Sequence, residues 1–133
     1  MNEILDLEEQ TNSYVSVINE TIDNTLDLYP DIVHLYNFGD LPCKPVIEME
    51  IVEPSDIRVE NLDTGESTTI TDNIIGEKIT LLNETEQIKT SRSAPYYKYD
   101  AHDENFITLR KYENTLRFYG SFKVKIIYQF KIL

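Results

Sequence analysis

The residues best suited to chemistry or recognition gather in one stretch, TSRSAPYYKYDAHDEN, which runs from Thr90 to Asn105. It has no helical or strand period, and loops of about fifteen residues inside a compact domain usually carry function. Exposed tyrosines offer flat contact area at a low ordering cost, which suits a protein contact or stacking on a sugar. We therefore take as candidate partner-contact residues Tyr96, Tyr97, Tyr99, Asp100 and His102. The alternative, in which the tyrosines fold back over one end of the domain, stays open.

A cation site is the second chemistry that this stretch suggests. Oxygen ligands in a loop suit calcium, and four potential ligands lie close together: Asp100, His102, Asp103 and Glu104. Their spacing does not match an EF-hand loop, and an acidic chain exposes many carboxylates by chance. We therefore interpret these side chains as a solvated acidic surface and predict no metal site.

The sequence carries no recognisable catalytic motif. Its two histidines, His34 and His102, belong to no HExxH pattern and accompany no nucleophile elbow. With 24 acidic residues in the chain, close carboxylates arise by chance, so no glycosidase-like pair is assigned. The sequence therefore predicts a protein that is not an enzyme and that uses no cofactor.

Charge and cysteine content exclude several classes of partner. The 24 acidic and 12 basic residues give a net charge of −12, which repels phosphate backbones, so nucleic acid is not an expected partner. Cys43 is the single cysteine of the sequence, which excludes a disulfide within the chain and a cysteine-based metal site. The opening MNEILDLEEQ is acidic where a signal peptide is basic, and no apolar run reaches the length of a membrane span. We expect a soluble protein made in a cytoplasm.

Period-two patterns and turn chemistry predict an all-β fold, an antiparallel β-sandwich. Asp63-Thr64-Gly65 separates two extended segments and is typical of a hairpin. In Val46–Val52 the apolar residues alternate with Glu48 and Glu50. The final strand alternates in the same way, and we expect one of its faces to be buried: Phe122, Val124, Ile126, Tyr128, Phe130 and Ile132.

Residues 29–133 are assigned to this sandwich, with eight or nine short strands. They include Ile32–Tyr36, Ser67–Thr71, Glu77–Leu82 paired with Gln87–Lys89, Phe106–Leu109 and, after a turn at Lys111–Asn114, Thr115–Tyr119. Residues 1–28 form a separate N-terminal arm that is either helical or extended. The helical alternative rests on the 3-4-4 spacing of Val15, Ile18, Ile22 and Leu26, which ends before Tyr29-Pro30.

The order of the turn and strand motifs resembles a known family. The motifs are Asn37-x-Gly39, Pro45-Val46-Ile47, Asn61-Leu62-x-Thr64-Gly65-Glu66, Gly76-Glu77-x-Ile79, Phe106-Ile107-x-Leu109, Glu113-Asn114-x-Leu116 and Gly120. Over residues 31–133 they are similar to the C-terminal domain of distal tail proteins of long-tailed bacteriophages and prophages. The chain departs from that family where Lys111-Tyr112 stands in place of a glycine or proline before Glu113.

The resemblance implies a galectin-like or jelly-roll-like sandwich in a virion, at the tail tip or baseplate, made in the bacterial host cytoplasm. Its implied partners are other tail proteins (tube, hub or receptor-binding protein) within a symmetric oligomer, with a cell-surface glycan and host attachment as further options. The alternative function is a stand-alone carbohydrate-binding module that binds glycans on a concave sheet face. The chain has no Trp and no recognisable secretion signal, which argues against that alternative.

Overall fold

The computed structural model describes residues 20–23, 31–93 and 96–130 of the 133-residue chain. These residues form nine strands and one short 3₁₀ helix, η3 (Lys98–Ala101). The strands are β1 (Glu20–Asp23), β2 (Asp31–Asn37), β3 (Val46–Ile51), β4 (Ile57–Asn61), β5 (Ser67–Ile70), β6 (Lys78–Leu82), β7 (Gln87–Thr90), β8 (Tyr112–Tyr119) and β9 (Phe122–Ile127).

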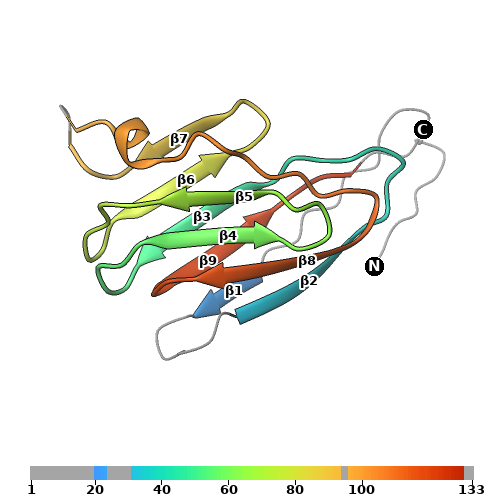
Figure 1. Cartoon of the computed structure of the whole chain (residues 1–133), viewed down its shortest axis with the longest axis horizontal. Coiled ribbons are helices and arrows are strands. Elements are labelled where there is room, and N and C mark those ends of the chain that lie inside the picture. The colour runs from blue at the N-terminus through green and yellow to red at the C-terminus, as the bar shows by residue number, and fades with distance from the viewer. Residues whose placement is uncertain (1–19, 24–30, 94–95, 131–133) are drawn as a thin grey trace.

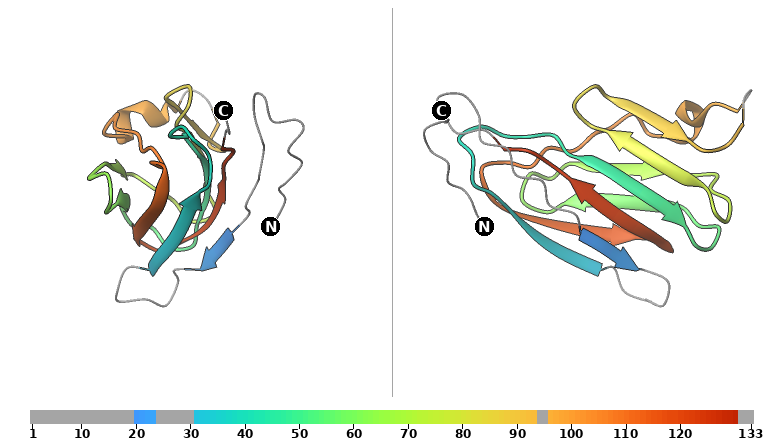
Figure 2. Two further views of the ribbon diagram at one scale, coloured as in Figure 1. Left: turned by 90° about the vertical axis from the view of Figure 1, so that its right-hand side faces the viewer. Right: turned by 180° about the vertical axis from the view of Figure 1, so that it is seen from behind.

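The strands build two antiparallel sheets that pack face to face (Figures 1 and 2). One sheet has five strands in the order β1-β9-β3-β6-β7, and the other has four in the order β2-β8-β4-β5. The chain crosses repeatedly between the sheets, and the first strand of each lies beside one of the last two strands, as the pairs β1–β9 and β2–β8 show. The predicted antiparallel sandwich is confirmed.

The hairpin predicted at Asp63-Thr64-Gly65 joins β4 to β5. Gly65 has φ +82°, a conformation that costs glycine little, and its N–H donates to the Asn61 carbonyl at 2.9 Å. Asn61 is fully buried, and its amide donates to the Thr108 carbonyl at 2.8 Å and to Asn114 Oδ1 at 3.1 Å. One polar side chain therefore ties this turn to the chain segment before β8.

The core lies between the sheets and takes the inward side chains that the alternation predicted. Phe122, Val124 and Ile126 of β9 are buried, while Lys123 and Lys125 are exposed. Phe122 meets Phe118 of β8 edge to face, with ring centroids 6.1 Å apart. Tyr128 and Phe130 continue the buried series beyond the strand, and Ile132 lies outside the described residues. The face assignment of the final strand is confirmed over 122–130.

Two sequence-based strand boundaries are wrong near β8. Phe106–Leu109 is not a strand, although Ile107 and Leu109 are buried. Leu109 makes only an isolated backbone bridge with Cys43. Side chains replace the ladder at the two residues before it: the Ile107 N–H donates to Asn83 Oδ1 at 2.9 Å and the Thr108 N–H donates to Glu66 Oε1 at 2.6 Å. The predicted turn at 111–114 belongs mostly to β8, which begins at Tyr112.

The N-terminal arm is extended where the structure describes it. Glu20–Asp23 form β1, which pairs with β9 and places Ile22 opposite Val124, so the helical alternative is wrong for these four residues. The intervening Thr and Asn residues are poor helix formers, and the outer edge of β9 offers an unpaired row of backbone groups. The rest of the arm lies outside the described residues.

Candidate functional site

The long segment between β7 and β8 covers one side of the sandwich. Ala101 to Asp103 run along the outer edge of β5: the Thr71 N–H donates to the Ala101 carbonyl at 2.7 Å, and the Asp103 N–H donates to the Thr69 carbonyl at 3.1 Å. His102 forms an isolated antiparallel bridge with Ile70. Figure 1 shows η3 beside β7, so the segment spans the gap between the edge strands of the two sheets. It is thereby held at both sheets.

A buried ion pair anchors this segment. Lys98 Nζ lies 3.0 Å from Glu77 Oε2, and neither side chain has any exposed area. The ammonium also donates to the Thr71 and Asp72 carbonyls and to Asn73 Oδ1, at 3.2, 2.9 and 2.8 Å. Burial lowers the pKa of Lys98, and the neighbouring Glu77 carboxylate opposes that shift. Because every acceptor is fixed, the backbone of η3 has a defined position.

Tyr96 belongs to this anchor rather than to a free surface. Its hydroxyl donates to Asp72 Oδ2 at 2.8 Å, and its ring centroid lies 3.6 Å from the Arg92 guanidinium carbon. Arg92 in turn donates to the Asp72 carbonyl at 2.9 Å. Burial raises the pKa of Tyr96 to about 12, and the hydrogen bond to Asp72 adds to the shift. Tyr96 is thus half-buried and engaged within the segment.

Tyr97, Tyr99 and Asp100 are the predicted contact residues that the structure leaves exposed. Tyr97 is 64% exposed and Tyr99 is 53% exposed, and both rings stand on the anchored η3 segment. Aromatic rings on a rigid support lose little entropy when a partner covers them. These three residues are called the η3 surface below.

His102, the fifth candidate contact residue, is interior. Its ring meets Phe106 edge to face at 5.0 Å, and its Nε2 lies 2.7 Å from Thr68 Oγ1. The Glu104 N–H donates to Nδ1 at 3.3 Å, which assigns the proton to Nε2 and makes Thr68 the acceptor. Burial lowers the pKa of His102, against the nearby charge of Asp103. His102 is a neutral, hydrogen-bonded core residue and cannot reach a partner.

Two further classes of site were searched for in the part of the chain that the structure describes. Across 20–23, 31–93 and 96–130, no three His, Cys, Asp or Glu side chains are placed to hold a metal ion. Within the same ranges there is also no helix with the length and apolar character needed to cross a membrane.

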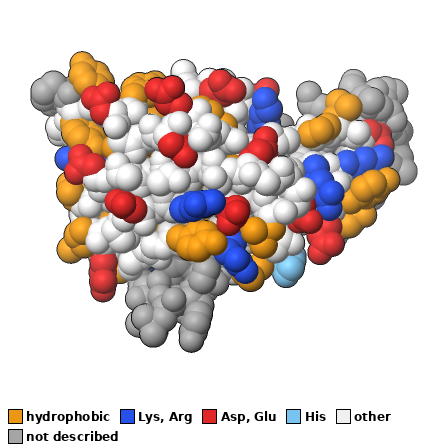
Figure 3. Space-filling model, in the orientation of Figure 1, with side chains coloured by type: hydrophobic (Ala, Val, Ile, Leu, Met, Phe, Trp, Pro, Cys, Tyr) orange, Lys and Arg blue, Asp and Glu red, His pale blue; other side chains and the backbone are white. Residues whose placement is uncertain are grey.

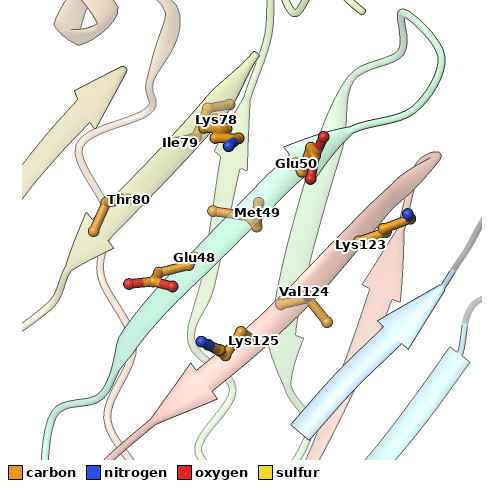
Figure 4. Close-up of a pocket in the computed structure, with 9 residues that line it drawn as sticks. All are labelled: Glu48, Met49, Glu50, Lys78, Ile79, Thr80, Lys123, Val124 and Lys125. Atoms are coloured by element: carbon orange, nitrogen blue, oxygen red, sulfur yellow. The ribbon is translucent and has the colours of Figure 1, made fainter. Parts of the chain in front are cut away.

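The outer face of the five-stranded sheet carries a shallow charged groove (Figure 4). Five of its nine lining residues are charged: Glu48, Glu50, Lys78, Lys123 and Lys125. Strand register places Glu48 opposite Lys125 and Glu50 opposite Lys123, so opposite charges stand side by side across β3 and β9. None of the nine residues is aromatic, so the groove offers no ring on which a sugar could stack.

A second exposed aromatic group was missed by the sequence analysis. Tyr36, Phe38 and Tyr112 are 42%, 62% and 55% exposed, and the Tyr36 ring centroid lies 4.5 Å from Phe38 and 6.1 Å from Tyr112. Tyr112 has φ +80°, a strained conformation for a tyrosine. The group lies where β2 ends and β8 begins, away from η3 (Figure 1). Figure 3 shows hydrophobic side chains at both ends of the face of the molecule that it draws. The alternation of Ile32, His34 and Tyr36 could have revealed it.

Fold and surface together define a class: an antiparallel β-sandwich module whose exposed aromatic side chains stand on rigid supports. The chain belongs to the family described as the phage tail C-terminal domain, whose family model matches residues 40–128, about two thirds of the sequence. No curated protein and no solved structure matches the chain. The protein is therefore a structural component of a phage tail and interacts with other tail proteins, which confirms the resemblance at that level.

Proposed function

We propose that this protein is a distal tail component, located at the tail tip or baseplate, and that its η3 surface binds a neighbouring tail protein. The observation that carries the proposal is the pair of exposed rings, Tyr97 and Tyr99, on a segment fixed by the buried Glu77–Lys98 ion pair. Loops that are held by a rigid scaffold are where recognition usually lies. The tube, the hub and the receptor-binding protein are the candidate neighbours.

We further propose that the domain acts by binding and not by catalysis. The buried His102 is committed to Thr68, while His34 lies on the opposite edge, 3.3 Å from Thr115 Oγ1 and 3.8 Å from Glu113. The two histidines are thus on different edges of the sandwich, and each is engaged by a threonine hydroxyl of a neighbouring strand. Attachment to the host surface, through sugar stacking on Tyr97 and Tyr99, is the additional role that this geometry permits.

The test is the double substitution Tyr97→Ser, Tyr99→Ser, made in the phage. Loss of an aromatic anchor costs about 2 kcal/mol or more in binding, roughly a thirtyfold drop in affinity. We expect the purified variant to keep its thermal midpoint, because both rings are largely exposed, and its copy number in purified tails to fall. Quantitative mass spectrometry of the tails measures that number, and adsorption of the particles to cells tests the attachment role.

Leu62→Ser is the matched control, since Leu62 is 42% exposed in the β4–β5 turn. It removes a comparable exposed apolar side chain outside the η3 surface. Normal incorporation of the double variant, or an equal loss in the Leu62 variant, would refute the η3 surface as the contact. A large fall in the thermal midpoint of the double variant, with normal assembly, would instead show that the two tyrosines pack against the core.

A further inference from the structure

The two outer edges of the four-stranded sheet, β2 and β5, differ in whether another segment pairs with them. The β5 edge is covered by Ala101 to Asp103, through the hydrogen bonds from Thr71 and to Thr69 described above. In the described part of the chain, no strand pairs with the outer edge of β2. Exposed edges present unpaired N–H and C=O groups, and proteins usually protect them. Among the described residues, the outer edge of β2 is therefore the unpaired edge of this sheet.

β2 lacks the features that normally protect an edge strand. It has seven residues, whereas the other edge strands, β1, β5 and β7, have four each. Its sequence, DIVHLYN, contains no Lys, Arg, Pro or Gly, and its one acidic residue, Asp31, stands at the first position of the strand. Two of its outward side chains are large and apolar, with Ile32 45% and Tyr36 42% exposed. A long, apolar, unguarded edge is suited to pairing with another strand.

The sequence of β2 is complementary to itself when it is run antiparallel. Directly opposite residues in an antiparallel pair point to the same face, so a two-fold axis has to pass through a residue of the strand. The axis through His34 is the one that pairs all seven residues of β2. It sets Ile32 against Tyr36 on the outer face, a β-branched and aromatic pair of the kind that stabilises sheets. On the inner face it sets Val33 against Leu35, which extends the core.

We propose that two copies of this chain associate through the outer edges of their β2 strands, antiparallel about a two-fold axis at His34. The two four-stranded sheets then become one continuous sheet, and the pairing brings Ile32 of each copy beside Tyr36 of the other on the outer face. The paired edge is about 24 Å long, at 3.4 Å per residue. Phe38 and Tyr112 remain at the rim of this interface. The proposal is independent of the η3 surface, which lies on the covered side.

Sedimentation velocity of the intact protein from low to high micromolar concentration tests the association. We expect a reversible monomer–dimer equilibrium for the natural sequence. Ile32→Lys should weaken the dimer by about tenfold or more. The two-fold symmetry places the substitution at two positions of the interface, and a lysine on an edge strand disfavours pairing with another strand. Ile75→Lys is the matched control: it makes the same charge change at a residue 67% exposed between β5 and β6, and it should leave the equilibrium unchanged.

Cysteine cross-linking tests the position of the axis. Cα atoms opposed on an antiparallel axis lie about 4.5 or 5.5 Å apart, within the range that a disulfide bridges. His34→Cys should therefore oxidise to a covalent dimer far faster than Ile75→Cys. Cys43 does not interfere, because burial, with the charge of Glu84, raises the pKa of its thiol to about 12.

Circular dichroism of each variant confirms that it is folded, and the natural sequence is measured beside it. A monomer at every concentration overturns the proposal, as does equal weakening by the two lysine substitutions. Equal cross-linking rates for the two cysteine variants overturn the axis at His34. Failure of the tyrosine substitutions to reduce incorporation into tails would leave all of these results unchanged, so the two proposals fail separately.

Discussion

Replacing Glu77 by Ala is expected to lower the free energy of unfolding by about 3–5 kcal/mol, the range for breaking a buried ion pair from one side. The Lys98 ammonium would keep its carbonyl and amide acceptors but lose its counter-charge in a site without exposed area. Arg92 Nη1 lies 3.7 Å from the same carboxylate. Without the negative charge of Glu77, the positive charges of Arg92 and Lys98 would repel each other. Denaturant titration followed by circular dichroism measures the loss.

Two further variants separate the ion pair from general damage. Glu77→Met combined with Lys98→Met removes both charges at similar volume, and part of the stability should return. The recovery is incomplete because the carbonyls that accept from Lys98 Nζ lose their donor. Arg58→Ala breaks the exposed Arg58–Glu60 pair, 3.6 Å apart, and should cost less than about 1 kcal/mol. If Glu77→Ala is as mild as Arg58→Ala, water reaches the Lys98 ammonium and the η3 segment is not anchored as described.

Ile126→Ala is expected to cost about 2–5 kcal/mol, the second large loss, because it opens a cavity in the middle of the core. Ile126 has no exposed area and lies opposite Ile47 of β3. Its chain neighbour provides the control: Ile127 is half-buried on the opposite face, and Ile127→Ala should cost about 1 kcal/mol. Equal losses in a urea titration would mean that the side chains of β9 are assigned to the wrong faces.

The faces of the strands were predictable because side-chain direction in a strand has a fixed period of two. Alternation alone placed Met49 and Val124 inside and Glu48 and Lys125 outside, as the structure does. The hairpin at Gly65 was equally predictable, since it depends on local turn chemistry. What these features share is that each is decided within a few residues.

The candidate site was only half predictable, because its geometry depends on residues far apart in the chain. Lys98 lies in a stretch without periodicity, where a lysine is expected to be solvated. Its burial depends on the Glu77 carboxylate, 21 residues earlier. The burial of His102 likewise depends on Thr68, 34 residues earlier. Tyr97 and Tyr99 were identified because an exposed tyrosine needs no distant partner.

Tyr112 shows the same limit in the backbone. No glycine marks the position, and its positive φ accompanies hydrogen bonds from the Asn114 side chain to the Tyr112 and Arg110 carbonyls, at 3.1 and 2.9 Å. A side chain two residues ahead therefore holds a conformation that the local sequence disfavours, and β8 begins earlier than turn chemistry predicts. The helical spacing of the N-terminal arm failed for a similar reason, since pairing with β9 overrides a weak local preference at Glu20–Asp23.

The pairing of the first strands with the last ones has a consequence for biosynthesis. β1 pairs with β9 and β2 with β8, so neither can find its place until the ribosome has released almost the whole described chain. The β4–β5 and β6–β7 hairpins can form earlier, but they have no complete core to close against. Such non-local topology folds slowly, on the millisecond to second scale, and leaves apolar strand edges exposed meanwhile. The nascent protein would then depend on chaperones most strongly between the synthesis of β2 and that of β8, while β2 has no partner strand.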